Sequence, residues 1–143
     1  MEKTIKLDVV TPARKTLSQD VNEVVLPGVE GSMGILPGHM AMVVALQPGM
    51  LKVLVQGQEM IYAIGGGWAE VTPSKVVVLA DTAEPAEDIN VEVSKHAREK
   101  ALAQLKEGVR GDALAEAEIS LKKALAELQV ADIVRRRKSG GRA

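Results

Sequence analysis

The 143-residue sequence contains no cysteine, no phenylalanine, one tryptophan, one tyrosine and two histidines. Without cysteine there is no disulfide, no thiolate nucleophile and no cysteine-ligated zinc. His39 and His96 are too few for a multi-histidine metal site, so no metal site is expected. The lack of aromatic residues excludes base-stacking platforms and aromatic cages. A formal net charge of −1 gives no general attraction to nucleic acid, and no nucleic-acid partner is expected.

Long apolar segments of the kind that cross membranes are also missing. Residues 31–51 carry no Asp, Glu, Lys or Arg and have the length of a membrane span. However, Pro37-Gly38 and Pro48-Gly49 interrupt them, and the remaining apolar run, Met40–Leu46, has the length of a strand. Residues 1–10 lack the apolar core of a signal peptide. The sequence therefore predicts a soluble chain that does not insert directly into a membrane.

The composition changes near residues 82–88. Residues 1–84 hold nine of the 13 glycines and five of the six prolines, with six basic and nine acidic side chains. Residues 85–143 carry 12 basic and 10 acidic side chains, and their only proline is Pro85. Glycine and proline separate strands, whereas their absence favours helices. We expect a first domain over residues 1–84, a helical region over 88–138 and a short tail over 139–143.

The first part has the pattern of an all-β sandwich. Ile5, Leu7 and Val9 alternate with polar residues, as in a half-buried strand. Turn signals recur about every 8–12 residues, and no helical pattern intervenes to build parallel crossovers. Gly65–Gly67 lacks the Lys-Ser/Thr of a phosphate loop, which favours a bend between two strands. Further strands are expected at residues 24–26, 43–46, 51–55, 60–64 and 76–80, the last buried on both faces.

The second part has the pattern of two amphipathic helices. Gly108–Gly111 separates them, and Asn90 and Asp112 are candidate N-caps. A short glycine-flanked break between two such helices predicts an antiparallel hairpin. Because both apolar stripes are rich in alanine, they bury little area and the hairpin is expected to be weakly held. The expected stripes are Val93, Ala97, Ala101 and Leu105 on the first helix, and Leu114, Ala117, Leu121, Ala124, Leu125 and Leu128 on the second.

Four segments in this order resemble the epsilon subunit of bacterial F-type ATP synthase. They are Leu7–Pro12 (LDVVTP), Gly34–His39 (GILPGH), Gly66–Val71 (GGWAEV) and Val76–Glu84 (VVVLADTAE). The resemblance implies a non-catalytic rotor subunit of the central stalk, with a β-sandwich and a helical hairpin. Its implied partners are the gamma subunit, the ring of c subunits and the alpha/beta catalytic head. It also implies a peripheral position on the cytoplasmic face of the bacterial inner membrane.

The resemblance further implies two sets of contact residues. A loop that docks on the c-ring and gamma corresponds to Glu30, Gly31, Ser32, Met33 and Gly34, with His39 nearby. The hairpin corresponds to a regulatory arm that permits ATP hydrolysis when folded and inhibits it when extended. Charge-assisted contacts from its bases to the catalytic head are expected. The candidates are Arg98, Lys106, Arg110, Lys122, Lys123, Arg135, Arg136 and Arg137.

Some members of this family bind ATP on the hairpin through an Ile/Leu-Asp-x-x-Arg-Ala motif. This chain has Ile89-Asn90-Val91-Glu92-Val93-Ser94 instead. An amide replaces the carboxylate, and valine replaces the arginine. Weak or absent ATP binding is therefore predicted, and no cofactor is expected.

Two other interpretations of the sequence remain open. The first is a stand-alone β-sandwich binding module whose hairpin forms a coiled-coil dimer, which predicts a stable homodimer. The second is a small-molecule enzyme, which needs a pocket with convergent polar groups. The sequence offers no such group of residues.

Overall fold

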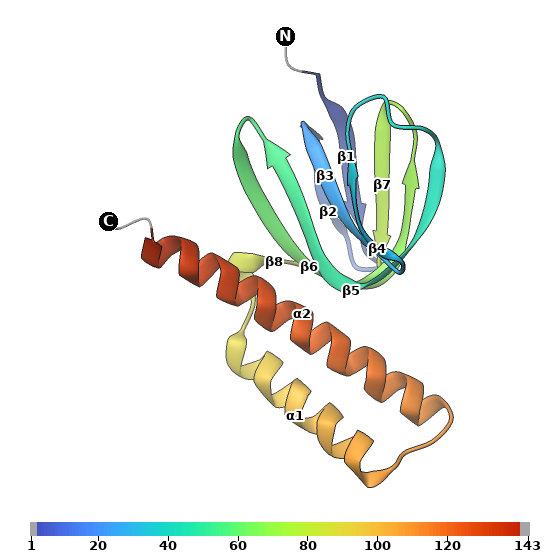
Figure 1. The fold of residues 1–143 in the computed structure, drawn as a ribbon, viewed down its shortest axis with the longest axis vertical. Coiled ribbons are helices and arrows are strands. Elements are labelled where there is room, and N and C mark those ends of the chain that lie inside the picture. Colours follow the sequence, from blue (N-terminus) through green and yellow to red (C-terminus); the bar gives the residue numbers. More distant parts are fainter. Residues whose placement is uncertain (1–2, 141–143) are drawn as a thin grey trace.

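The computed structural model describes residues 3–140. Figure 1 shows a β domain at one end and two packed helices at the other. The strands are β1 (Ile5–Val10), β2 (Lys15–Val21), β3 (Glu23–Gly28), β4 (Gly31–Ile35), β5 (Met42–Val55), β6 (Gln58–Val71), β7 (Lys75–Ala80) and β8 (Ala83–Pro85). A 3-10 helix η1 (Ala86–Asp88) leads to α1 (Val91–Glu107) and α2 (Asp112–Gly140). The predicted sandwich followed by a two-helix hairpin is confirmed.

The strands form one mixed sheet in the order β2-β1-β7-β6-β5-β3-β4, with β8 added to β6. All neighbours are antiparallel except β1 and β7, which pair in parallel from Lys6–Lys75 to Val10–Leu79. The expectation that parallel pairs are absent is therefore wrong. No crossover helix is needed, because strands β2 to β6 themselves make the connection between β1 and β7.

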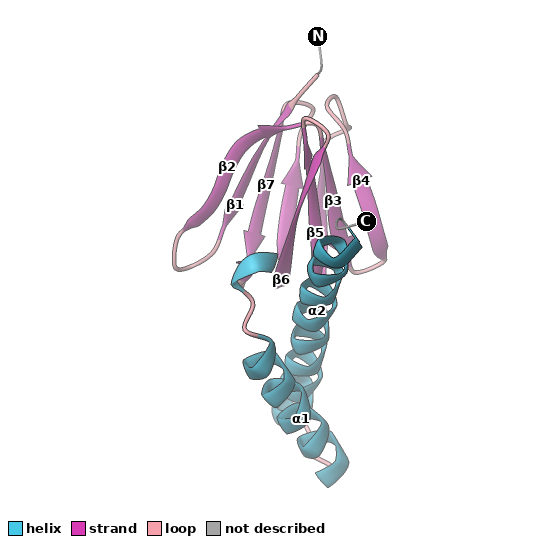
Figure 2. Ribbon diagram, turned by 90° about the vertical axis from the view of Figure 1, so that its left-hand side faces the viewer, coloured by secondary structure: helices cyan, strands magenta, loops and turns pink. Residues whose placement is uncertain are grey.

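The two longest strands, β5 and β6, pass through both layers of the sandwich. Each has 14 residues, and they pair from Met42–Val71 to Val55–Gln58. The sequence predicted a break at Pro48-Gly49, but these residues pair with Gly65 and Ile64 inside the ladder. One half of β6 pairs with β7 and the other half with β8. Figure 2 shows the strands spread side by side, from β2, β1 and β7 at the left to β5, β3 and β4 at the right.

Glycine at position 67 makes the change of layer possible. Gly66 and Gly67 have φ values of +99° and +137°, which side chains rarely tolerate. A Cβ atom built on Gly67 would lie 2.0 Å from the carbonyl oxygen of Leu79. The predicted bend is therefore real, but it lies within β6 rather than between two strands.

The core lies between the two layers. It is formed by the side chains that the strands of both layers direct inward. Leu7, Val9, Leu51 and Val53 are fully buried in it. β7 alternates instead of being buried on both faces, because Val76 and Val78 are buried whereas Leu79 is 51% exposed. The prediction of a doubly buried strand at residues 76–80 is wrong, and the outward-facing apolar residues require another explanation.

The helices pack through small side chains. The Asn90 side chain caps α1 as predicted, accepting a hydrogen bond from the Val93 N–H at 3.2 Å. Asp112 is instead the first residue of α2, after Gly111 with φ +62°. Of the four alanines in the predicted stripes, Ala101, Ala117 and Ala124 are buried and Ala97 is half-buried. Val93, Leu114 and Leu125 lie outside the contact and are exposed.

Helix α2 also packs on the outer surface of β5 and β6. Ile61, Ala63, Ala86 and Val130 form a second buried apolar cluster, separate from the main core. Met50, Ile89, Ile133 and Val134 pack around it. The C-terminal half of α2 therefore covers part of the outer surface of β5 and β6, at the end of the sandwich that faces the helices (Figure 1).

Candidate docking surfaces

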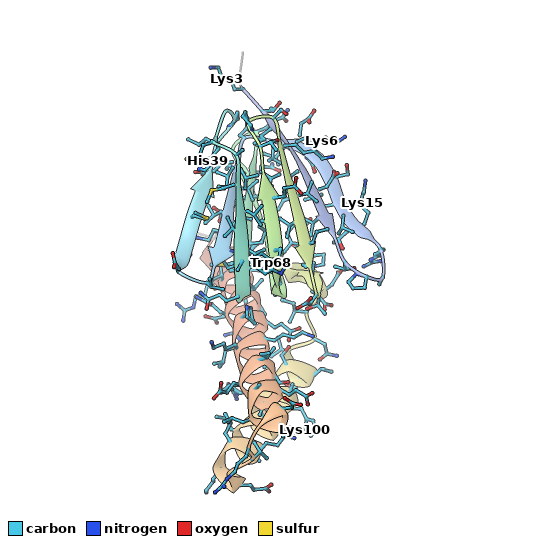
Figure 3. The ribbon with its side chains drawn as sticks, turned by 90° about the vertical axis from the view of Figure 1, so that its right-hand side faces the viewer. Lys3, Lys6, Lys15, His39, Trp68 and Lys100 are labelled. Carbon is cyan, nitrogen blue, oxygen red and sulfur yellow. The ribbon has the colours of Figure 1, made fainter. Side chains whose placement is uncertain are left out.

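The outer surface of the other layer carries several exposed apolar side chains. No described helix covers it, and Figure 3 looks onto this surface, with Trp68 in the lower part of the sheet, toward the helices. The strand register places Ala45, Trp68, Leu79 and Val10 in one row across β5, β6, β7 and β1. Trp68 is 57% exposed and Leu79 is 51% exposed. We call this surface, formed by Val10, Val43, Ala45, Trp68, Val77 and Leu79, the Trp68 face; the exposed Glu70 lies on it between Val43 and Val77.

Charged side chains border the Trp68 face on β1, β2 and β7. The Asp8 carboxylate accepts a 2.7 Å hydrogen bond from the Ser18 hydroxyl and lies 3.4 Å from the Lys75 ammonium. The hydrogen bond from Ser18 is the main cause that lowers the pKa of Asp8, with Lys75 and Lys15 adding to it. An apolar centre with a polar rim is typical of protein–protein contact surfaces.

This surface was not predicted from the sequence, although a signal was present. Leu79 alternates with buried Val78 and Ala80, so β7 is apolar on both sides from Val76 to Ala80. Such a run is typical of a strand covered on both faces. In this chain, the second covering layer does not come from the described residues.

The predicted docking loop lies elsewhere, around the β3–β4 hairpin. Gly28 pairs with Gly31, so Val29 and Glu30 form the turn. Glu30, Gly31, Ser32 and Gly34 are exposed, whereas Met33 packs against the main core. Four of the five residues are therefore available to a partner.

His39 is not brought together with Glu30. It follows the opposite end of β4, and five strand residues at about 3.3 Å each separate the two ends. Its Nδ1 atom lies 2.9 Å from the Met40 carbonyl, and its backbone N–H bonds to the Leu36 carbonyl. The Leu36–Met40 loop thus forms a separate exposed region at the far end of the sheet (Figure 3).

The predicted bases of the hairpin differ in how far their side chains are exposed. Lys106, Arg110 and Lys122 are exposed, whereas Arg98 is half-buried. The Lys123 side chain lies close to Gly65 of the sandwich, with its Cδ atom 3.6 Å from the position of a Cβ on that glycine. Burial raises the pKa of the neighbouring Glu127, an effect that Glu84 strengthens and Lys123 opposes.

The last three predicted bases all have acidic partners in the folded hairpin. Arg135 and Arg136 each approach a carboxylate oxygen of Asp132 at 2.9 Å, within α2. Arg137 instead pairs with Glu59 on β6. The predicted tail begins inside α2, since the helix ends at Gly140, and residues 141–143 lie outside the described residues.

A cavity of about 420 Å³ lies between η1, α1 and the end of α2. Lys95, Arg98 and Arg135 contribute bases to its lining, and Asp132 contributes an acid. The uncharged Asn90 amide already caps α1, and Val93 is an apolar side chain that is 63% exposed. Neither residue therefore offers a charge to a nucleotide. Calorimetry of the full chain with ATP is expected to detect no micromolar affinity. A micromolar dissociation constant would contradict this prediction.

Other site types are absent from the described part of the chain. Within residues 3–140, no group of three or more His, Asp or Glu side chains is placed to hold a metal ion. Neither helix in the same range is long and apolar enough to cross a bilayer.

The chain matches the delta/epsilon chain family of ATP synthase subunits. The family model described as "ATP synthase, Delta/Epsilon chain, beta-sandwich domain" matches residues 4–86. The ATP synthase epsilon chain of Herpetosiphon aurantiacus is 44% identical over 93% of this chain and 98% of its own length. The epsilon chain of Dehalococcoides mccartyi strain BAV1 is 44% identical over 90% of this chain and 92% of its own.

A solved structure extends the match to three dimensions. A chain in the mitochondrial ATP synthase of Euglena gracilis, solved with its F1 part and c-ring, superimposes with a TM-score of 0.77 at 29% identity. The match covers 91% of this chain and 81% of the Euglena chain. The present chain belongs to the ATP synthase epsilon chain family and is a non-catalytic subunit of that complex. This result favours the ATP synthase interpretation over a stand-alone module or an enzyme.

Proposed function

We propose that this chain is a central-stalk subunit of the rotor in a proton-translocating F-type ATP synthase. It couples the c-ring and gamma to the catalytic head, on the cytoplasmic face of a bacterial inner membrane. The observation that carries the proposal is the Trp68 face, an apolar surface that the described chain leaves uncovered. The similar Euglena chain comes from an assembly that contains F1 and the c-ring, which supports this placement.

The sandwich, residues 1–84, supplies two docking surfaces in this proposal. The Trp68 face binds gamma, because an apolar surface of this kind needs a protein partner that removes it from water. The exposed residues Glu30, Gly31, Ser32 and Gly34 of the β3–β4 hairpin bind the c-ring. The two surfaces lie on different parts of the sheet, so both partners can be held at once.

The hairpin, residues 88–138, acts as a regulatory arm. Among the described residues, its contact with the sandwich consists mainly of the small cluster around Ile61 and Val130 and the Arg137–Glu59 ion pair. A small contact surface allows a folded and an extended form to differ by only a few kcal/mol. In the extended form the exposed bases Lys106, Arg110 and Lys122 face acidic segments of the catalytic head and inhibit ATP hydrolysis.

Deletion of residues 88–143 tests both parts of the proposal. Tagged full-length and truncated chains are recovered from membranes, and ATP hydrolysis is assayed in each preparation. We expect gamma, alpha and beta to co-purify with both chains, and hydrolysis to rise with the truncated chain. Co-purification without a rise would reject the inhibitory arm alone. Failure of the full-length chain to recover any partner would reject the stalk role.

A further inference from the structure

The C-terminal end of α2 meets β6 in a regular register. Along β6, Ile61 and Ala63 face α2, whereas Met60 and Tyr62 face the main core. Because strand side chains alternate, Glu59 lies on the same face as Ile61 and Ala63. The side of β6 toward α2 therefore has two apolar residues followed by one carboxylate.

Helix α2 presents a matching stripe. Val130, Ile133 and Val134 pack against Ile61 and Ala63. Arg137 follows at the next position of the same helical stripe, seven residues after Val130. The stripe of α2 therefore ends in a guanidinium at the point where the β6 row ends in a carboxylate.

The two ends meet in the structure. The Arg137 Nη2 group donates a hydrogen bond to Glu59 Oε1, across 78 positions of the sequence. The Glu59 side chain is 32% exposed and that of Arg137 is 50% exposed, so the pair is partly shielded from water. Among the described residues, Arg137–Glu59 is the one ion pair that joins α2 to β6.

We propose that Arg137 and Glu59 form a clasp that biases the hairpin toward its folded position on the sandwich. The inference rests on the proposed regulatory function of the hairpin, and it gives Arg137 a role opposite to that of an inhibitory contact. Partly exposed ion pairs contribute about 0.2–1 kcal/mol, so the clasp adjusts the equilibrium while the apolar cluster supplies most of the docking. Loss of the clasp is expected to raise the undocked fraction about two- to fivefold.

The experiment uses the absence of native cysteine. Ala13→Cys on the sandwich and Ala103→Cys on α1 carry a donor–acceptor pair of fluorescent labels on the full chain. Energy transfer between the labels is followed along a urea titration. Undocking of the hairpin is then observed whatever fraction is already undocked in the absence of urea. Glu59→Gln and Arg137→Gln are each expected to favour undocking about two- to fivefold. The double variant is expected to add little to either.

Arg136→Gln is the matched control, since it removes the same charge one position away from Arg137. Among the described residues, the Arg136 side chain pairs only with Asp132. It is expected to leave undocking unchanged. Exchanging the charges, with Glu59→Arg and Arg137→Glu together, is expected to restore docking. Equal effects of Arg136→Gln and Arg137→Gln, or no effect of Glu59→Gln, would overturn the clasp.

The same variants in the assembled enzyme separate the clasp from the proposed function. Glu59→Gln is expected to lower ATP hydrolysis by favouring the extended arm. If the labels report undocking but deletion of residues 88–143 leaves hydrolysis unchanged, the clasp stands and the inhibitory arm is rejected. If Arg137→Gln raises hydrolysis while Glu59→Gln does not alter docking, Arg137 is an arm contact and the clasp is rejected.

Discussion

Replacing Trp68 with alanine is expected to weaken binding to gamma by about 30-fold to several hundred-fold. Truncating a central aromatic residue of an interface commonly costs about 2–4 kcal/mol, and tryptophan is enriched among such residues. Trp68 lies in the middle of the row formed by Ala45, Leu79 and Val10. The change is measured by co-purification from membranes and by titration of the tagged chain with isolated gamma.

Two controls make the Trp68 result specific. Leu102→Ala removes an apolar side chain that is 49% exposed on α1, away from the Trp68 face, and is expected to leave gamma binding unchanged. Because Trp68 is 57% exposed in the free chain, the thermal unfolding midpoint of the Trp68→Ala chain should differ little from that of the original chain. Undiminished binding by a folded Trp68→Ala chain would mean that gamma docks elsewhere.

Substituting Gly67 is expected to have the largest effect on stability. Alanine at this position would place its Cβ atom 2.0 Å from the Leu79 carbonyl oxygen, and both atoms belong to paired strands that cannot separate freely. The φ value of +137° adds backbone strain. We expect a loss of more than about 4 kcal/mol, a large part of the stability of a domain this size.

Denaturant unfolding followed by circular dichroism measures this loss, with Gly57→Ala as the control. Gly57 also has a positive φ, +79°, but a Cβ there would meet no heavy atom within 4 Å among the described residues. Only the conformational cost of about 1–2 kcal/mol then applies. If both variants lost the same stability, the close approach to the Leu79 carbonyl oxygen would not contribute to the loss.

The order of a β domain followed by a two-helix hairpin could be predicted from the sequence because local signals agree with the fold, although strands β2 and β4 were not predicted. The Asn90 cap, the break at Gly108–Gly111 and the alanine stripes act over a few residues. The continuity of β5 through Pro48-Gly49 could not be predicted, because it depends on pairing with Ile64 and Gly65. The parallel pairing of β1 and β7 is likewise a tertiary property.

The candidate surfaces show the same division. The exposed β3–β4 turn could be located from its resemblance to the family alone. The Trp68 face could not, since an apolar strand residue looks the same in sequence whether its own chain or a partner covers it. The partner of Arg137 also could not be predicted from the sequence, because Glu59 lies on a strand that is distant in sequence. Only the register of α2 on β6 brings the two side chains together.

The parallel β1–β7 pair also has a consequence for how the chain reaches its native state. Lys6 pairs with Lys75, so the first strand cannot enter the sheet until most of the sandwich has been synthesised. Contacts between residues so distant in sequence slow folding, whereas helical hairpins form from local contacts within microseconds to milliseconds. Until β7 arrives, the inner side of the β1–β2 hairpin, with Ile5, Leu7 and Val9, stays unprotected. During synthesis on the ribosome, the aggregation risk of this protein is therefore concentrated at its N-terminus.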